Sequence, residues 1–395
     1  MKACHLVYSY FPFDPRVRKE VDTLRKLGHS IDVIATRDAR EPREETIRGV
    51  PVRRVPVPVV RGGKARYGFQ YALFFLLASA LLLSLHLRRR YEIVHVHSLP
   101  DFQVFGALPA KLLGARVVLD LHEALPEIVA ARFRLSMSSP LVRIAQALEW
   151  MSCAVADTVL VVNDVIRDRI IGRGVDPAKV TVVMNTPDPD LFVLRDTDRR
   201  RSELGLANQK AIVYVGGINQ ERDLALLVRA AARVRKSCDL KLFIFGYGSS
   251  VYRNQLTEIA KQEGFDGHFL LGPQIPAEDV FSYISLSEVG PVTYERNPLT
   301  EVAVPNKVFE YAAAHKPLVI ADLPALRSVF GDTALYYVPG DVDDLARKIE
   351  SLFADPALGA RLAKQADGVL NGCSWTVMSD RLQRIYANSG AAGGG

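Results

Sequence analysis

Short apolar segments alternate with helical patterns along the whole chain of 395 residues, which is long enough for two domains. Each apolar segment suits a buried strand, and a helix with one apolar face follows, as at 16–27. Such units predict parallel sheets with helices on both faces. The pattern stops at a polar segment, 185–206, and restarts near Lys210. The sequence therefore predicts an α/β protein of two facing Rossmann-like domains, 1–190 and 191–370, with a cleft between them.

The predicted strands follow from the same pattern. In the first domain we expect them at 4–9, 31–35, 52–57, 93–97, 116–121, 158–162 and 179–183. In the second domain we expect them at 211–215, 241–245, 269–271, 288–292, 318–321 and 334–338.

Composition limits the possible partners. A net charge of +6 suits anionic ligands such as nucleotide phosphates or lipid headgroups. The chain has no long basic tail and no interleaving of aromatic and basic residues, so we expect no nucleic-acid partner. Four widely spaced cysteines form no CxxC pair, which indicates reduced thiols, a cytoplasmic protein and no metal site.

The segment 304–320 predicts a helix followed by a buried strand. Asn306 can cap the helix start, Glu310 lies one turn later, and Pro317 ends the helix. This places the Glu310 carboxylate at the mouth of an α/β sheet, where such folds bind ligands. Taken alone, Glu310 could equally be a solvated helix residue.

A second candidate site is the turn at 214–223, which predicts a strand, two glycines and a helix start. Gly216 and Gly217 allow a ligand close to the backbone, and a helix N-terminus attracts anions. Arg222 adds a cation, so the turn could hold a pyrophosphate. It matches neither GxxxxGK[ST] nor GxGxxG, which argues against a dinucleotide oxidoreductase.

In the first domain, the apolar strand at 117–121 is followed by polar residues at its carboxyl end, the edge that faces the crevice in open α/β sheets. We expect His122 to be functional and Asp120 to point into the fold. His97 and Asp101 follow the preceding strand, and could line a pocket or be structural.

The run at 69–87 is apolar or aromatic except for one Gln, two Ser and one His. Basic residues flank it, namely Arg61, Lys64 and Arg66 before it and Arg88–Arg90 after it. Because it lies between strands of one sheet, we expect peripheral membrane contact through 69–90 instead of a spanning helix. The alternatives are a wholly buried helix or a dimer contact.

The 304–320 segment resembles the nucleotide-sugar signature of retaining glycosyltransferases of family 4, which have the GT-B fold. There a glutamate on this helix holds the donor ribose, and Glu310 stands at that place. The family's other glutamate, eight residues earlier, falls on Val302. Further segments resemble the family in the right order, so the resemblance covers essentially the whole chain: 13–18, 94–101, 117–123, 185–188, 214–223, 245–248 and 271–275.

The resemblance implies a donor site on the second domain. Arg222 stands where the family has a lysine that contacts the diphosphate. Gly217 stands where the family has an arginine, so one cation is either missing or supplied from elsewhere, with Lys307 and Arg18 as candidates. The implied donor-binding residues are Gly216, Gly217, Arg222, Gly246, Tyr247, Gly248, Ile275, Asn306, Lys307 and Glu310.

The resemblance also implies an acceptor side on the first domain, with His122 near the transferred sugar and the leaving group. A helix at 371–388 would cross back to the first domain, as in the GT-B fold. The implied catalytic residues are His122, Arg222 and Glu310, and the acceptor-side residues are Arg16, Arg18, His97, Asp101, His122 and Glu123.

The expected function is that of a retaining glycosyltransferase with a nucleotide-diphosphate sugar as donor, no other cofactor and no obligatory metal. A lipid-linked or surface-polysaccharide precursor would be the acceptor, at the inner face of the membrane. Two alternatives stay open: a nucleotide-sugar epimerase or hydrolase of the same fold, and a non-catalytic membrane-associated nucleotide-sugar-binding subunit.

Overall fold

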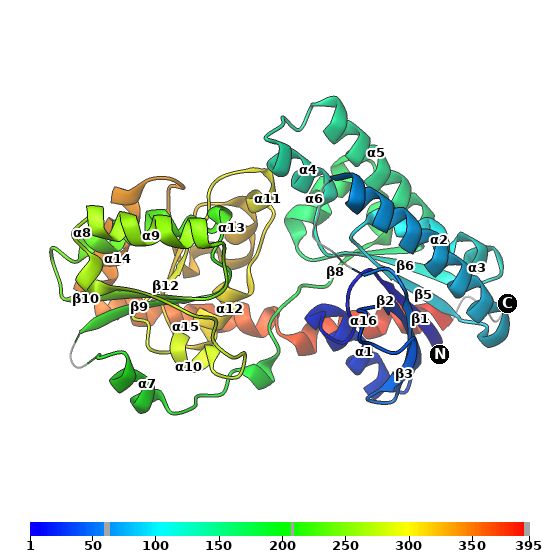
Figure 1. The fold of residues 1–395 in the computed structure, drawn as a ribbon, viewed down its shortest axis with the longest axis horizontal. Coiled ribbons are helices and arrows are strands. Elements are labelled where there is room, and N and C mark those ends of the chain that lie inside the picture. Colours follow the sequence, from blue (N-terminus) through cyan, green and yellow to red (C-terminus); the bar gives the residue numbers. More distant parts are fainter. Residues whose placement is uncertain (59–63, 207–208, 391–395) are drawn as a thin grey trace. The chain divides into compact units, whose positions relative to one another are not determined.

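The structure is a computed structural model that describes residues 1–58, 64–206 and 209–390 (Figure 1). It divides into two compact units. The N-terminal unit comprises Met1–Asn185 and the chain from Thr376 onward, and the C-terminal unit comprises Thr186–Trp375. The chain thus first passes between the units at 185–186, and not at the expected 190–191. Arg61, one of the basic residues predicted to flank a membrane helix, lies outside the described residues.

The N-terminal unit is built on an eight-stranded sheet in the order β3-β4-β2-β1-β5-β6-β7-β8. All neighbours pair in parallel except β3 and β4, which form an antiparallel edge that the sequence pattern did not predict. The strands are β1 (Lys2–Val7), β2 (Ser30–Thr36), β3 (Glu44–Ile47), β4 (Val50–Val55), β5 (Ile93–His97), β6 (Arg116–Leu121), β7 (Thr158–Val161) and β8 (Val180–Val182).

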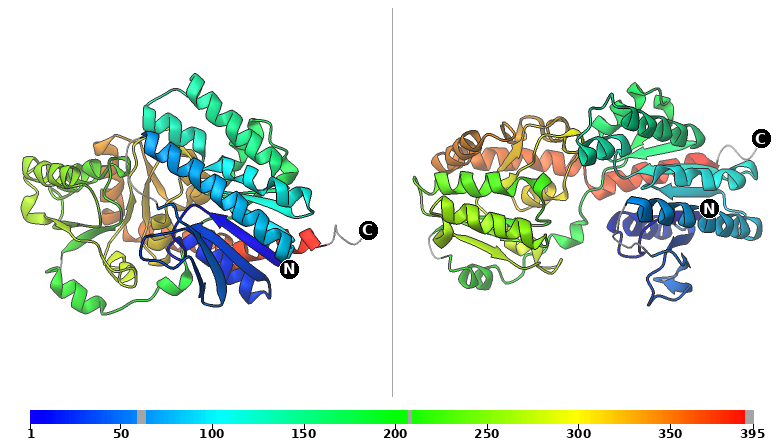
Figure 2. Two further views of the ribbon diagram at one scale, coloured as in Figure 1. Left: turned by 45° about the vertical axis from the view of Figure 1, so that its right-hand side comes forward. Right: turned by 45° about the horizontal axis from the view of Figure 1, so that its top comes forward.

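Helices cover both faces of this sheet, with α2 and α5 on one side and α1 and α16 on the other (Figures 1 and 2). Its helices are α1 (Pro15–Lys26), α2 (Lys64–Arg89), η1 (Asp101–Ala107), α3 (Leu108–Leu112), α4 (Leu125–Phe133), α5 (Pro140–Val155), α6 (Asp164–Gly172), η2 (Pro177–Lys179) and α16 (Trp375–Gly390), whose first residue belongs to the C-terminal unit.

The C-terminal unit contains two three-stranded parallel sheets, β11-β10-β9 and β12-β13-β14. Its strands are β9 (Lys210–Val215), β10 (Leu240–Phe245), β11 (Phe269–Gly272), β12 (Gly290–Val292), β13 (Leu318–Ala321) and β14 (Leu335–Tyr337). Its helices are η3 (Pro189–Leu191), α7 (Thr197–Glu203), η4 (Gln220–Arg222), α8 (Leu224–Val234), α9 (Ser250–Gln262), η5 (Asp266–His268), α10 (Val280–Ile284), α11 (Pro298–Glu301), α12 (Asn306–Ala313), α13 (Pro324–Phe330), η6 (Gly331–Thr333), α14 (Val342–Ala354) and α15 (Pro356–Gly372).

Helix α1, which contains the buried charged residues Arg16 and Glu20, has clear start and stop signals in its local sequence. The Asp14 side chain accepts hydrogen bonds from the amides of Arg16 and Val17, at 3.1 and 3.2 Å, and Pro15 occupies the first helical position. After the helix, Gly28 adopts φ +86°, which ends the helix with little strain.

The long helix α2 is apolar on its outer face as well as its inner face. Its sequence places Phe69, Ala72, Leu76, Ala80 and Leu87 along one side, and all five are exposed. It is long and apolar enough to cross a membrane. Only 28% of its apolar 18-residue segment is buried inside the protein. The alternative of a wholly buried helix is therefore wrong.

The last helix packs on the N-terminal unit through Met378, Leu382 and Tyr386, which are all buried. We expect Leu382→Ala to destabilise this unit by roughly 2–5 kcal/mol, because it removes a buried side chain and leaves a cavity. Denaturant unfolding followed by Trp150 fluorescence, in a Trp375→Phe background, would measure it. The exposed neighbour change Gln383→Ala should have little effect. Equal stability of both variants would contradict this packing.

Candidate active site

Helix α12 is held to the sheet by its buried face. Val308, Phe309 and Tyr311 are buried, and the Tyr311 hydroxyl donates a 2.7 Å hydrogen bond to the Val213 carbonyl of β9. The N-cap of α12 is Pro305 and no side chain caps the helix, so the prediction that Asn306 caps it is wrong. Asn306 is the first helical residue instead.

Two charged side chains of α12, Lys307 and Glu310, lie one turn apart on a half-buried surface. Their Nζ and Oε2 atoms are 4.0 Å apart, and the side chains are 14% and 21% exposed. Burial raises the pKa of Glu310, which Lys307 partly offsets, and burial lowers the pKa of Lys307. Among the described residues, Oε2 of Glu310 has no hydrogen-bond partner. This oxygen is itself buried, but the side chain is 21% exposed, so its carboxylate has spare capacity to accept a hydrogen bond from a ligand hydroxyl.

The glycine turns after β9 and β10 pack directly against each other. The Gly216 amide donates to the Phe245 carbonyl and the Ile218 amide to the Tyr247 carbonyl, both at 2.8 Å. A Cβ on Gly246 would overlap the carbonyl oxygen of Gly216, and one on Gly248 would overlap Ile218. These positions exclude side chains because two backbone segments meet there.

Lys307 lies across the first of these turns, since a Cβ on Gly216 would overlap its side chain. Its Nζ is also 5.1 Å from the centre of the Tyr214 ring. The structure thus places Lys307, one of the two cations considered from sequence, at the glycine turn. Arg18 belongs to the other unit, where it is half-buried.

Arg222 ends the short helix η4, and the longer helix α8 begins only at Leu224, with Asp223 as its side-chain cap. The helix start expected in this segment is thus the short helix η4, at whose end Arg222 lies. Nη1 of Arg222 donates to the Tyr294 hydroxyl, and its guanidinium lies 4.8 Å from that ring's centre. The aromatic contact fixes the direction of this cation.

Three supporting residues were not predicted from sequence. Tyr214 donates a 2.9 Å hydrogen bond to the Gly217 carbonyl, and Tyr294 orients Arg222. Arg253 donates to the carbonyls of Gly246 and Gly272, at 2.9 and 3.0 Å, and so ties two loops together. Carbonyl-binding arginines carry no sequence signature, because their partners are backbone atoms.

The remaining predicted donor residues differ in accessibility. Tyr247 is 64% exposed beside the glycine turn, whereas Ile275, on the predicted base-side loop, is 9% exposed.

In the N-terminal unit, Arg16 is buried and forms a two-pronged ion pair with Asp120. Its Nε and Nη2 donate to the two carboxylate oxygens at 2.8 and 2.6 Å, and Nη1 donates to the Val183 carbonyl at 2.9 Å. Burial works against the Asp120 carboxylate, but the Arg16 charge together with the contacts from His122 and His97 outweighs it and holds the pKa of Asp120 well below its usual range. Asp120 points into the fold as predicted. Arg16 does not reach an external anion, which corrects its acceptor-side assignment.

His122 is the accessible end of this cluster, with 18% exposure. Its Nε2 lies 3.0 Å from Oδ2 of Asp120 and 3.1 Å from Nδ1 of His97, and its amide donates to the Ser98 hydroxyl. His97 and Asp101 are both fully buried, so neither lines an open pocket. Their burial supports the structural alternative and corrects their acceptor-side assignment.

Glu123 is exposed next to His122. Of the predicted acceptor-side residues, Arg18, His122 and Glu123 can meet a ligand.

Two groups of side chains contain donor types that also occur in metal sites: His5, Glu20, His95 and His97, and His97, Asp120 and His122. The histidines of the first group bond to one another and to Tyr386 instead, and an arginine lies beside its carboxylate. We assign no metal to either group.

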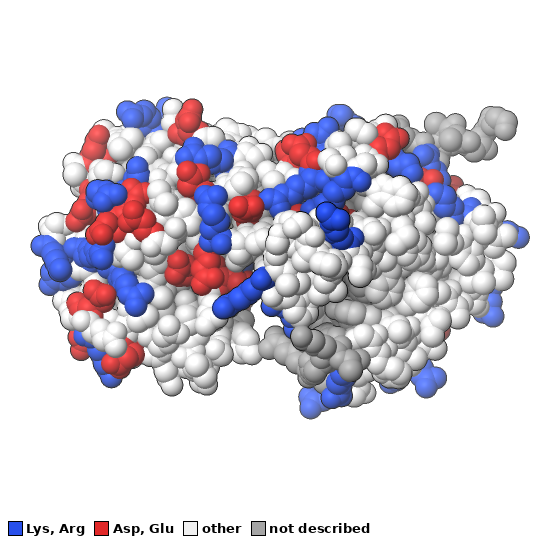
Figure 3. Space-filling view, turned by 90° about the horizontal axis from the view of Figure 1, so that it is seen from above, with Lys and Arg blue, Asp and Glu red and all other residues white. Residues whose placement is uncertain are grey.

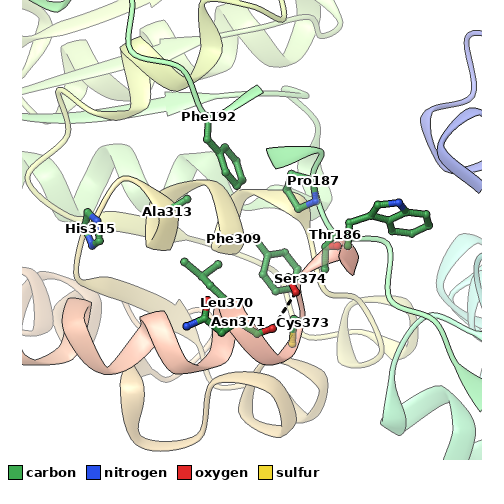
Figure 4. A pocket seen from close by; sticks show the side chains of 11 residues that line it. Thr186, Pro187, Phe192, Phe309, Ala313, His315, Leu370, Asn371, Cys373 and Ser374 are labelled. Carbon is green, nitrogen blue, oxygen red and sulfur yellow. Dashed lines mark hydrogen bonds between the residues drawn. The ribbon is translucent and has the colours of Figure 1, made fainter. Parts of the chain in front are cut away.

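A separate cavity of about 330 Å³ lies on the other face of α12 (Figure 4). Phe309 and Ala313 point into it, whereas Lys307 and Glu310 do not line it. Its remaining lining is mostly apolar: Thr186, Pro187, Phe192, His315, Leu370, Asn371, Cys373, Ser374 and Trp375. It contains none of the predicted donor or acceptor residues.

Comparisons with known proteins assign the two units separately. Residues 14–186 match the glycosyl transferase 4-like domain, and residues 209–355 match glycosyl transferases group 1. A D-inositol 3-phosphate glycosyltransferase from Catenulispora acidiphila is 26% identical over 396 residues, with 95% of this chain and 91% of that protein covered.

Solved structures show the same fold. Sucrose-phosphate synthase from Thermosynechococcus elongatus superposes with a TM-score of 0.80 at 17% identity, covering 99% of this chain and all of that one. Anabaena HepE in complex with UDP-glucose superposes with a TM-score of 0.74 at 14% identity, covering 98% and 100%. The predicted GT-B fold is thus confirmed. The chain belongs to glycosyltransferase family 4, the group 1 glycosyltransferases that transfer a sugar from a nucleotide sugar.

Proposed function

We propose that this glycosyltransferase acts with retention of configuration and holds a nucleoside-diphosphate sugar on its C-terminal unit. The observation that carries the proposal is the half-buried Glu310 with a free carboxylate oxygen beside Lys307 and the glycine turns. Glu310 accepts from the ribose hydroxyls, as the family resemblance implies. UDP-glucose in the Anabaena relative is the first donor to try.

Lys307 and Arg222 stabilise the leaving diphosphate. Lys307 lies across the glycine turn, and Arg222 is near enough for its charge to lower the pKa of Lys307. Each cation is oriented by a tyrosine ring. Positive groups fixed before the reaction favour the charge that develops on the leaving group. With two such cations the reaction needs no obligatory metal and no further cofactor. His122, backed by the Asp120 carboxylate, acts at the acceptor side with its other ring nitrogen.

We further propose that α2 lies on an anionic membrane at its cytoplasmic side, which suits a lipid-linked acceptor. Figure 3 shows a wide uncharged area on the N-terminal unit with Lys and Arg at its border. The exposed side chains of α2 include Phe69, Leu76 and Leu87, and Arg66 and Arg88 near its two ends are exposed. Apolar side chains between cations favour an in-plane helix on anionic headgroups.

Glu310→Gln should weaken the apparent affinity for the donor by roughly 10- to 150-fold, since a hydrogen bond to a charged group contributes about 1.5–3 kcal/mol. The assay is nucleoside-diphosphate release from UDP-, GDP-, ADP- and TDP-sugars with lipid-linked acceptors. Glu258→Gln, an exposed change on α9, is the matched control. Undiminished transfer by the Glu310 variant would contradict the assignment of Glu310 to the donor site.

Gly246→Ala should reduce UDP affinity, because the added methyl group must push the two glycine turns apart. Isothermal titration calorimetry of the variant and the wild type would measure the change. Gly267→Ala is the control, as a Cβ there meets no atom within 4 Å. If both variants bind UDP as the wild type does, the packed turns do not shape the donor site.

Leu76→Gln combined with Leu87→Gln should weaken binding to phosphatidylglycerol vesicles by roughly tenfold or more. Each leucine that becomes buried in the membrane contributes about 1.5–3 kcal/mol to binding. Vesicle sedimentation measures this, and phosphatidylcholine vesicles should bind less. Val251→Gln with Leu270→Gln, exposed on the C-terminal unit, is the control pair. Equal binding of both pairs would refute the membrane surface. A concentration-dependent dimer that the α2 pair alone disrupts would assign that face to a second copy.

A further inference from the structure

A pocket of about 450 Å³ lies at one edge of the N-terminal sheet, between α6, α16 and the edge strand β8. Its volume falls within the range of small-molecule sites, roughly 300–1,000 Å³. It contains none of the residues predicted for the donor or the acceptor. Three arginines and one aspartate give its lining a net formal charge of +2. The lining residues are Asp164, Arg167, Val180, Thr181, Val182, Arg381, Arg384 and Ile385.

Two of the arginines are neighbours on α16 and lack a counter-ion. Arg384 is exposed, and its guanidinium has no hydrogen-bond or ion-pair partner among the residues that the structure describes. Arg381 lies one turn earlier, so the two like charges repel each other. Neither lies in the last turn of α16, where the helix dipole would offset the repulsion. Asp380, the adjacent acid, forms no ion pair within the described part of the chain.

The wall formed by β8 supplies further hydrogen-bond donors. Nη1 of Arg381 donates to the Val182 carbonyl at 2.9 Å, which fixes the guanidinium against the strand and leaves its other N–H groups for a ligand. The Val183 amide donates to β7, and successive peptide groups of a strand point to opposite sides. The Val182 amide therefore points outward, as unpaired groups of an edge strand do. The Thr181 hydroxyl is a further possible donor.

The third arginine, Arg167 of α6, is held only loosely by acids. Its Nη1 lies 4.0 Å from Oδ1 of Asp164 and 3.8 Å from Oδ1 of Asp168. Both acids are exposed, and exposed ion pairs contribute little to stability. An anion in the pocket can therefore share Arg167 without breaking a strong interaction.

Phosphate is the anion that this set of donors suits. Arginine guanidinium groups bind phosphate oxygens through paired hydrogen bonds, and backbone amides add further donors. A phosphate monoester carries about −1.5 to −2 charges near pH 7, which matches the charge of the lining. The pocket is larger than a phosphate group alone requires. Val180 and Ile385 give it an apolar wall for an organic part such as a sugar ring.

The position of the pocket favours a soluble ligand over a lipid headgroup. Helix α2, the proposed membrane contact, packs on β1, β2 and β4. The pocket lies beside β8, at the edge of the sheet opposite to β3 and β4. A membrane bound along α2 is thus not the source of phosphate at this edge.

We propose that this pocket binds a small soluble phosphorylated molecule, whose phosphate lies between Arg167, Arg381 and Arg384. The ligand ties α16 to the edge of the sheet. Strand β8 precedes the first passage of the chain between the units, at 185–186, and α16 follows the second. The ligand therefore acts on both passages and is an effector of the enzyme. This effector role rests on the proposed function, whereas the binding site itself does not.

The first test is isothermal titration calorimetry of the full chain with glucose 6-phosphate, inorganic phosphate and glucose. We expect both phosphates to bind and glucose not to bind. Arg384→Glu should weaken phosphate binding by roughly tenfold or more, because it removes a charged donor and adds a repelling charge. Arg143→Glu on α5 is the matched control, since it reverses another exposed arginine. Neither change removes a hydrogen bond within the described chain, so both variants should fold.

Equal phosphate affinity of the two variants would overturn the site, and so would the absence of binding by either phosphate at millimolar concentration. Binding of glucose as tight as that of glucose 6-phosphate would overturn the ligand class. Hydrogen–deuterium exchange locates the ligand, and we expect glucose 6-phosphate to protect 180–184 and 376–388. Protection of these segments by phosphatidylglycerol vesicles, but by neither soluble phosphate, would overturn the soluble source.

The second test is the coupling between the pocket and the donor site. Glucose 6-phosphate and UDP should change each other's Kd by the same factor, roughly fivefold or more, because coupling between two sites is reciprocal. In Arg384→Glu the effect on UDP affinity should disappear. A UDP affinity that ignores bound glucose 6-phosphate would contradict the effector role. Binding of glucose 6-phosphate as predicted, in a chain without any transferase activity, would instead contradict the proposed function alone.

Discussion

The N-terminal unit depends on the buried ion pair between Arg16 and Asp120. One guanidinium joins α1 to the carboxyl end of β6 and to the carbonyl that follows β8, so it fixes three elements at the sheet edge. A buried charge of this kind is tolerated only when it is fully paired. Asp120 then orients both His97 and His122, and only His122 reaches the surface. The accessible histidine is therefore the outer end of a network that the fold requires.

In the C-terminal unit, contacts between backbone segments hold the candidate site in place. The turns at Gly216 and Gly246 touch without side chains between them, and Arg253 ties the second turn to the next loop. Lys307 and Arg222 are each placed against a tyrosine ring, which limits the directions a cation can take. In both units, the charged groups named above are thus held in place by structural partners.

Much of the fold followed from sequence, because buried parallel strands are short, mostly apolar segments such as 93–97 and 117–121. The edge strand β3 was missed, since its sequence at 44–47, Glu-Glu-Thr-Ile, carries no apolar run. Side-chain burial was predicted less well. Arg16 and His97 look like surface candidates by residue type, and only the three-dimensional partner Asp120 explains why they are inside. The position of Lys307 over Gly216 also depends on tertiary packing, which neither the 304–320 segment nor the 214–223 segment reveals by its sequence.

The central claim is that Glu310, Lys307, Arg222 and the glycine turns bind the nucleoside diphosphate of a donor. Ligand-induced thermal stabilisation of the purified chain with UDP, GDP, ADP and TDP tests it most directly. A ligand at 100 times its Kd should add about 2.7 kcal/mol to the free energy of unfolding. The account predicts a clear upward shift with one of the four nucleotides. No shift with any of them, in a folded sample, would contradict it.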